Sequence, residues 1–154
     1  MNSYTFDSNI LIGMERIYPR PYFEGLWGSI EDLIAEGRAC ICTMVGEELK
    51  RGTDDLHSWA KSMGGFIHPP RENELEVVSR ISSDHPGWVV EQRNAADPFV
   101  IAHALGEGSI VVTQETKKGP GTADHNLKIP NVADEHSVDC IDFFGLMRAE
   151  EWRF

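Results

Sequence analysis

The sequence has no long apolar run. No stretch approaches the ~18 consecutive apolar residues that a membrane-spanning helix requires, so we do not expect a membrane protein. The first residues, MNSYTFDSN, contain neither a basic leader nor an apolar stretch with a small-residue cleavage site. We therefore expect a cytoplasmic protein. Repeats, low-complexity tracts and Gly/Ser linkers are also absent, so residues 1–154 are expected to form one domain.

Cysteine is scarce, with three residues in the chain. Cys40 and Cys42 would lie on the same side of a strand, too close for an ordinary disulfide. No tetrahedral Cys or His spacing of the kind typical of zinc sites accompanies them. The pattern favours buried thiols for Cys40, Cys42 and Cys140 over a metal site.

Positive charge is also in short supply. The chain has 14 Lys and Arg residues against 25 Asp and Glu residues, which gives a net charge of -11. This argues against broad, sequence-independent binding to nucleic acid, which normally depends on a large basic surface. It does not exclude a nuclease, because carboxylates at a divalent-metal site repel phosphate only until the metal arrives.

What the sequence does contain is a set of short apolar segments that alternate with helical patterns. Strands are predicted at 4–6, 39–43, 109–113 and 138–141, and helices at 9–14, 23–34, 45–52, 57–63, 72–81, 97–105 and 143–148. Residues 84–94 are expected to be irregular and 114–126 to form a polar loop. Apolar strands that alternate with helices indicate an α/β protein, a three-layer α/β/α sandwich with a central, mainly parallel sheet.

Four acidic residues fall where such sheets place their sites, beyond the carboxyl ends of the strands. Asp7 directly follows the first strand, and Glu48 lies in the helix after the second. Glu115 lies two residues past the strand at 109–113. Asp97 begins the helix that leads into that strand, and a helix antiparallel to its strand starts at the strand's carboxyl end. The four carboxylates are therefore expected to converge.

Each acid taken alone also has a structural explanation. Asp97 could be a helix N-cap with Pro98 at the first helical position, Asp7 a turn residue, and Glu48 and Glu115 solvated charges. Converging carboxylates repel one another, by about 1 kcal/mol per close pair in water and about 4 near a protein surface. Convergence therefore predicts a cation. Oxygen ligands suit Mg²⁺ or Mn²⁺, which can activate water for phosphodiester hydrolysis.

Five motifs in a specific order and spacing carry a resemblance to a known family. They are YTFDSN at 4–9, EELKRG at 47–52, ADPFVIAHA at 96–104, VVTQE at 111–115 and KIPNV at 128–132. The chain resembles the PIN-domain nucleases, most closely the PIN-like proteins that open with a YxFDSN motif. The resemblance implies a PIN-like fold and a Mg²⁺- or Mn²⁺-dependent endoribonuclease, often the toxin of a toxin–antitoxin pair.

The resemblance also implies which residues form the site. Asp7, Glu48, Asp97 and Glu115 match the positions that bind metal and support catalysis. Glu48 is chosen over Glu47 because the family's second acid precedes Leu. Most PIN domains have Asp at the position of Glu115, and the longer side chain could change how directly it contacts metal. Ser8 and Asn9 are expected to orient Asp7 or the metal-bound water.

Further residues near these motifs are weaker candidates. Thr113 could hydrogen-bond an acidic ligand, or could simply end a strand. Asp124 is a candidate for an outer ligand. Lys117, Lys118 and Lys128 lie in a glycine-containing loop that could grip substrate phosphates, or could be a solvated turn. His103 lies on an apolar helix and is predicted to be a hydrogen-bonded core residue.

Two classes of function follow. The first is a ribonuclease with RNA as substrate and, from the resemblance, an antitoxin partner and a homodimer. The second is a PIN-like protein-binding module without catalytic activity. Glu115, in place of the usual Asp, and the acidic surface are the features that favour this alternative. An aspartyl phosphatase is disfavoured because Asn9 stands where that chemistry usually needs a second Asp.

Overall fold

The computed structural model describes all of residues 1–154 and contains a five-stranded parallel sheet. The strands are β1 (Tyr4–Phe6), β2 (Ala39–Cys42), β3 (Ile67–His68), β4 (Ile110–Val112) and β5 (Cys140–Ile141). Their order across the sheet is β3-β2-β1-β4-β5, and every neighbouring pair is parallel. The sequence prediction of a parallel central sheet is confirmed.

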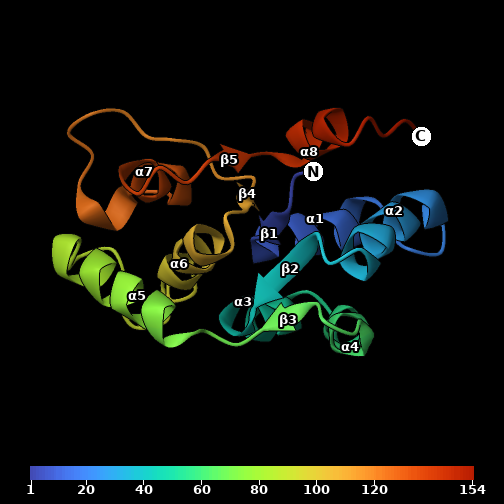
Figure 1. Cartoon of the computed structure of the whole chain (residues 1–154), viewed down its shortest axis with the longest axis horizontal. Helices are drawn as coiled ribbons and strands as arrows, with labels where there is room; N and C mark the ends of the chain where they lie inside the picture. Colours follow the sequence, from blue (N-terminus) through green and yellow to red (C-terminus); the bar gives the residue numbers. More distant parts are fainter.

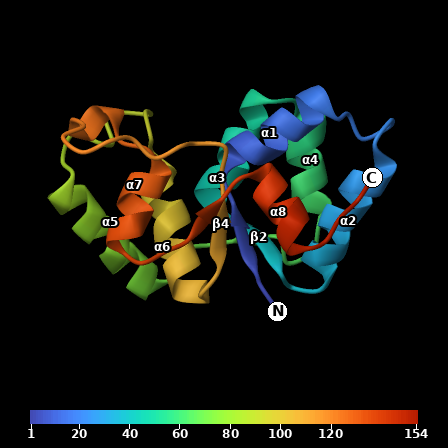
Figure 2. The ribbon, with the colours of Figure 1, turned by 90° about the horizontal axis from the view of Figure 1, so that it is seen from above.

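Helices cover both faces of this sheet (Figures 1 and 2). They are α1 (Ser8–Ile17), α2 (Glu24–Ala35), α3 (Thr43–Glu48), α4 (Asp54–Ser62), α5 (Glu72–Asp84), α6 (Asp97–Glu107), α7 (Ile129–Glu135) and α8 (Phe143–Ala149). In both views α5, α6 and α7 lie on one side of the strands, and α1, α2, α4 and α8 lie on the other. The predicted three-layer α/β/α sandwich is confirmed.

One hydrophobic core of 33 buried residues joins the layers. Its centre is β1, whose three residues are all inaccessible to solvent, as expected for the middle strand of a sheet covered on both faces. α6 is buried along most of its length, which explains its nearly continuous apolar sequence. Trp27, Trp59 and Trp88 are at most 4% exposed, so the structure places these three rings in the core.

The parallel arrangement decides where the site can form. β1, β2 and β4 are adjacent in the sheet, so the residues that follow them emerge at one edge, called here the carboxyl edge. α6 packs against these strands and leads into β4, so it begins at the same edge. Segments near residues 7, 48, 97 and 115 are thereby brought together.

Two elements were not predicted from the sequence. β3 has only two residues, too few for a visible alternation of apolar and polar side chains. α7 is a seven-residue helix with Pro130 in its first turn and with Ile129, Val132 and Ala133 buried. It directly follows a polar loop, and so short a helical pattern is hard to distinguish from a continuing loop. No helix of the protein combines the length and apolar character needed to cross a bilayer.

Candidate active site

Asp7 lies at the end of β1 and is only 4% exposed. Its Oδ1 accepts a hydrogen bond from the Ser8 amide at 2.8 Å, which caps the start of α1. Its Oδ2 accepts a 2.8 Å hydrogen bond from the Thr113 hydroxyl at the end of β4. The hydrogen bond expected from Thr113 to an acidic residue is therefore present. Both carboxylate oxygens of Asp7 are fixed by residues of neighbouring segments.

Asn9 ties the start of α1 to the segment that follows β4. Its side-chain amide lies 3.4 Å from the Thr113 hydroxyl, and its carbonyl oxygen accepts from the Gln114 amide at 3.2 Å. The Thr113 hydroxyl in turn accepts from the Glu115 amide at 3.1 Å. Asn9 thus acts on Asp7 indirectly, through Thr113, and also fixes the backbone that carries Glu115.

Glu48 and Glu47 differ sharply in their surroundings. The Glu48 carboxylate accepts a hydrogen bond from the Ser8 hydroxyl at 3.3 Å, and its side chain is 20% exposed. Burial raises its pKa, and the carboxylate of Glu115 raises it further, while Arg51 and the Ser8 hydroxyl oppose the shift. Glu47 instead extends into solvent and pairs with Lys50 at 2.6 Å. Glu48 is the residue that faces the other acids.

Asp97 is the first residue of α6 and is 8% exposed. The sequence interpretation of Asp97 as the N-cap is wrong, because Ala96 occupies that position and no side-chain cap bond forms. The helical turn starts one residue earlier than the Asp-Pro pair suggests. Burial raises the pKa of Asp97 to about 9, and the carboxylates of Asp7, Glu115 and Glu48 add to this increase.

Glu115 is half-buried, and its Oε2 accepts from the Ile129 amide at the start of α7 at 3.2 Å. Burial raises its pKa, whereas the Ile129 amide and the charge of Lys128 lower it. Burial likewise raises the pKa of Asp7 to about 7. The hydrogen bond from Thr113 opposes that shift, and the charges of Glu115 and Glu48 increase it.

The structure therefore brings the four predicted acids to one edge of the sheet, close enough to disfavour one another's ionisation. Their oxygens do not form a closed coordination shell. The one trio of His, Cys, Asp or Glu ligand atoms that all lie within 4.8 Å of one another is formed by Cys40, His68 and His103. The chemistry of the four carboxylates still fits Mg²⁺ or Mn²⁺, because a divalent cation would favour the ionised forms that burial now disfavours.

The remaining candidates lie farther along the polar loop. Asp124 accepts hydrogen bonds from the His85 ring at 3.0 Å and from the Gly87 amide at 3.4 Å, so it connects two loops. Lys117 pairs with Asp134 at 2.8 Å. The Lys118 backbone is held by Asn131, whose side chain bonds both its amide and its carbonyl group. The Lys118 side chain is exposed.

Two basic residues lie at the site: Lys128, which was considered from the sequence as part of the glycine-containing loop, and Arg51, which was not singled out. Lys128 lowers the pKa values of both Asp97 and Glu115, which places its charge near these acids. Arg51 pairs with Glu48 at 3.3 Å. Both belong to motifs that carry the PIN resemblance, KIPNV and EELKRG, and for Arg51 its place in EELKRG was the available signal.

Comparison with solved structures shows the same fold in two proteins. The crystal structure of VapBC2 from Rickettsia felis bound to a promoter DNA fragment includes a chain with a TM-score of 0.53 and 14% identity. The match covers 91% of the present chain and 98% of that chain. VapBC-1 from nontypeable Haemophilus influenzae gives a TM-score of 0.53 at 12% identity, with 92% and 98% covered. At such identities the likeness extends to the fold alone.

Comparison with curated proteins gives no match. Among family models, residues 4–154 match the one described as "Domain of unknown function (DUF4411)". The match starts at β1 and runs to the last residue, so it spans all the elements that position the four acids. The chain therefore belongs to the DUF4411 family.

Proposed function

We propose that this protein is a divalent-metal-dependent endoribonuclease whose metal ligands are Asp7, Glu48, Asp97 and Glu115. One observation carries the proposal. Four carboxylates from distant parts of the chain face one edge of the sheet, and all four have raised pKa values. Clusters of this kind are costly for folding and are typical of functional sites.

When bound, Mg²⁺ or Mn²⁺ would supply a water of lowered pKa and would neutralise charge on the phosphate. The protein's own residues would orient the ligands. Thr113 and the Ser8 amide hold Asp7 in one rotamer, and the Ser8 hydroxyl holds Glu48. Such outer hydrogen bonds fix ligand geometry before the metal arrives.

Basic residues around the acids would bind the RNA backbone. Lys128 lies near Asp97 and Glu115, and Lys117 and Lys118 follow on the adjoining loop. The net charge of -11 makes a broad basic RNA-binding surface elsewhere on the protein unexpected. We therefore expect phosphate contacts to be confined to this side of the site and binding to be sensitive to salt.

We further propose that the ribonuclease is the toxin of a toxin–antitoxin pair. Support comes from the resemblance to PIN-domain nucleases and from the fold shared with chains of two VapBC structures. An antitoxin encoded by a neighbouring gene would then bind this chain. Expression of the protein alone should arrest growth, and co-expression of the neighbouring gene should restore it. Normal growth with a demonstrably active enzyme would contradict the toxin role.

RNA cleavage tests the ribonuclease proposal directly. Single-stranded and structured RNAs are incubated with the protein in the presence of Mn²⁺ or a chelator. We expect cleavage that the chelator abolishes and that Asp97→Asn removes. Glu47→Gln is the matched control, because Glu47 is exposed and pairs with Lys50. Cleavage that survives both chelation and Asp97→Asn would refute the proposal.

A protein-binding module without catalytic activity is the second candidate. The observation in its favour is that the four carboxylates do not close into a coordination shell. Calorimetric titration of Mn²⁺ separates the two candidates, because a ribonuclease should bind Mn²⁺ saturably in a manner that depends on Asp97. A module that lacks the chemistry should show no such binding.

A further inference from the structure

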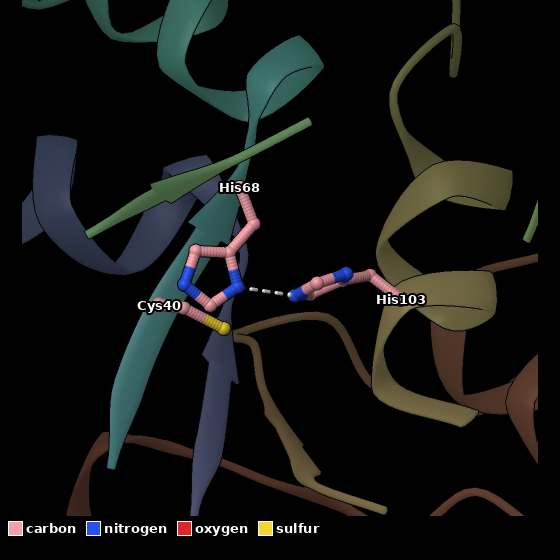
Figure 3. Close-up of side chains that lie close together, drawn as sticks. All are labelled: Cys40, His68 and His103. Carbon is pink, nitrogen blue, oxygen red and sulfur yellow. Dashed lines mark hydrogen bonds between the residues drawn. The ribbon is translucent and has the colours of Figure 1, made fainter. Parts of the chain in front are cut away.

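Cys40, His68 and His103 form a second cluster of potential metal ligands, on β2, β3 and α6 (Figure 3). The Cys40 sulfur and one ring nitrogen of each histidine all lie within 4.8 Å of one another. Cys40 and His103 are almost fully buried, and His68 is partly exposed. The predicted core position of His103 is confirmed, but its partners are themselves metal-binding residue types.

A carboxylate completes the group. Glu107 Oε1 lies 3.4 Å from His68 Nδ1 and 3.6 Å from His103 Nε2, while the two ring nitrogens are 3.0 Å apart. Tetrahedral zinc with Zn–N distances of about 2.0–2.1 Å requires ligand atoms about 3.4 Å apart. The separations among the Glu107 oxygen and the two ring nitrogens are close to those edges, and the Cys40 sulfur lies within 4.8 Å of one ring nitrogen of each histidine. Arg71 holds the Glu107 carboxylate in place at 2.8 Å.

The outward-facing nitrogens of both rings have acceptors. His68 Nε2 lies 2.9 Å from the Gly65 carbonyl oxygen, which can only accept, so this nitrogen carries a proton. His103 Nδ1 lies 2.8 Å from Glu74 Oε1. Glu74 is 2% exposed, and its carboxylate, when ionised, can only accept a hydrogen bond from the ring. With protons on these outer nitrogens, neutral rings point two lone pairs at each other. A shared proton or a bound cation between the two nitrogens would stabilise that arrangement.

In metal-bound histidines, a carboxylate or backbone carbonyl typically accepts a hydrogen bond from the ring nitrogen that does not bind the metal. The acceptors of His68 and His103 match this pattern. A shared proton would explain the two rings alone. It would not explain why a thiol and a further carboxylate approach the same point. The second oxygen of Glu74 is buried without a hydrogen-bond partner, and Arg71 Nε lies 3.9 Å from it.

We propose that Cys40, His68, His103 and Glu107 bind one Zn²⁺ ion, separate from the carboxylate site. Thiolate, imidazole and carboxylate ligands in tetrahedral arrangement suit zinc rather than Mg²⁺ or Mn²⁺. Binding forms a zinc–sulfur bond and releases the Cys40 thiol proton to solvent. The partly exposed side chains of His68 and Glu107 give the ion an entry path.

The ion would connect three elements of the fold. It would hold α6 against β2 and β3. α6 is also the helix that begins with Asp97. His103 and Asp97 are six residues apart, or roughly 9 Å along the helix axis. Zinc would therefore stabilise the packing of the helix that carries one of the four acids, without contacting substrate.

Metal analysis and cobalt substitution test this proposal without an activity assay. Chelator-treated protein is titrated with Zn²⁺ against a chromophoric competitor, and separately with Co²⁺. We expect one zinc per chain and, with cobalt, a thiolate-to-metal charge-transfer band. Cys40→Ser should abolish that band, whereas Cys42→Ser, a buried cysteine of the same strand, should retain it. Asp97→Asn should also retain it, which separates this site from the carboxylates.

Variants of the partly exposed ligand His68 and of Glu74, which contacts a ligand, extend the test if Cys40→Ser fails to fold. His68→Gln should also abolish stoichiometric zinc binding. Glu74→Gln should weaken zinc affinity by roughly 10- to 100-fold, the usual effect of losing a carboxylate that orients a histidine ligand. Absence of stoichiometric zinc from the wild-type protein would overturn the proposal. So would unchanged affinity in both variants, or a cobalt complex without the charge-transfer band.

Discussion

The hydroxyl of Thr113 donates a 2.8 Å hydrogen bond to Asp7, across the 106 residues that separate them in the chain. Both residues are buried, and the bond links the ends of the adjacent strands β1 and β4. The same hydroxyl accepts from the Glu115 amide. One small side chain therefore positions two of the four acids.

Thr113→Val should lower metal affinity or the cleavage rate by roughly 10- to 100-fold, the usual effect of losing an outer hydrogen bond to a metal ligand. Valine keeps the shape of threonine and suits the end of a strand, so the fold should persist. Mn²⁺ titration and cleavage kinetics measure the effect. Thr116→Val, at an exposed loop position, is the matched control and should have none. Equal behaviour of the two variants would show that Thr113 has no positioning role.

Glu48→Gln and Glu47→Gln form a second matched pair on adjacent residues. Glu48 faces Ser8 at the carboxyl edge, while Glu47 pairs with Lys50 in solvent. Loss of the Glu48 charge should abolish Mn²⁺-dependent cleavage, and loss of the Glu47 charge should leave it unchanged. The measurement is the initial rate of RNA cleavage at saturating Mn²⁺. A larger loss of cleavage rate in Glu47→Gln would contradict the assignment of Glu48 and would place the site on the other face of α3.

Asp97→Asn should raise the unfolding temperature of the metal-free protein, more at about pH 8 than at about pH 5. Burial raises the pKa of Asp97 from 3.8 to about 9, so between these values the folded chain binds more protons than the unfolded chain. Stability therefore falls as pH rises through this range, and asparagine removes that contribution. Thermal unfolding in chelator measures it. An equal shift at both pH values would contradict the raised pKa.

His85→Gln should destabilise the protein more at about pH 6 than at about pH 9. The His85 ring bridges Asp124 at 3.0 Å and Glu135 at 2.7 Å. Burial lowers the His85 pKa, but the bonds to Glu135 and Asp124 outweigh this and raise it overall. The stabilisation is complete below the unfolded pKa of about 6.5 and is lost as pH rises through the folded value. Urea unfolding at both pH values measures the difference in unfolding free energy between the wild type and His85→Gln. An equal difference at about pH 6 and about pH 9 would show that the bridge does not depend on charge.

The sequence was sufficient to predict the architecture because apolar strands and helices alternate clearly. It also placed the four acids, since parallel strands bring their carboxyl ends to one edge of a sheet. It did not predict β3 or α7, which are too short for periodicity to show. The N-cap assignment of Asp97 failed because the first helical turn starts at Ala96, a difference of one residue that local sequence does not determine.

The cluster of Cys40, His68 and His103 shows a different limit of sequence analysis. Its members are separated by 28 and 35 residues and lie on different elements, so no short ligand motif connects them. They meet because β2 and β3 are adjacent and α6 packs against the sheet. The same topology placed the acids correctly, but His68 lies on β3, the strand that the sequence did not reveal.

Crystals soaked in Mn²⁺ and measured for anomalous scattering provide the most direct test of the carboxylate site. We predict a Mn²⁺ peak at the carboxyl edge of the sheet, contacted by Asp7 and Asp97 and lost in Asp97→Asn. The absence of a peak there, or a peak confined to Cys40, His68 and His103, would contradict a metal-dependent nuclease built on these acids.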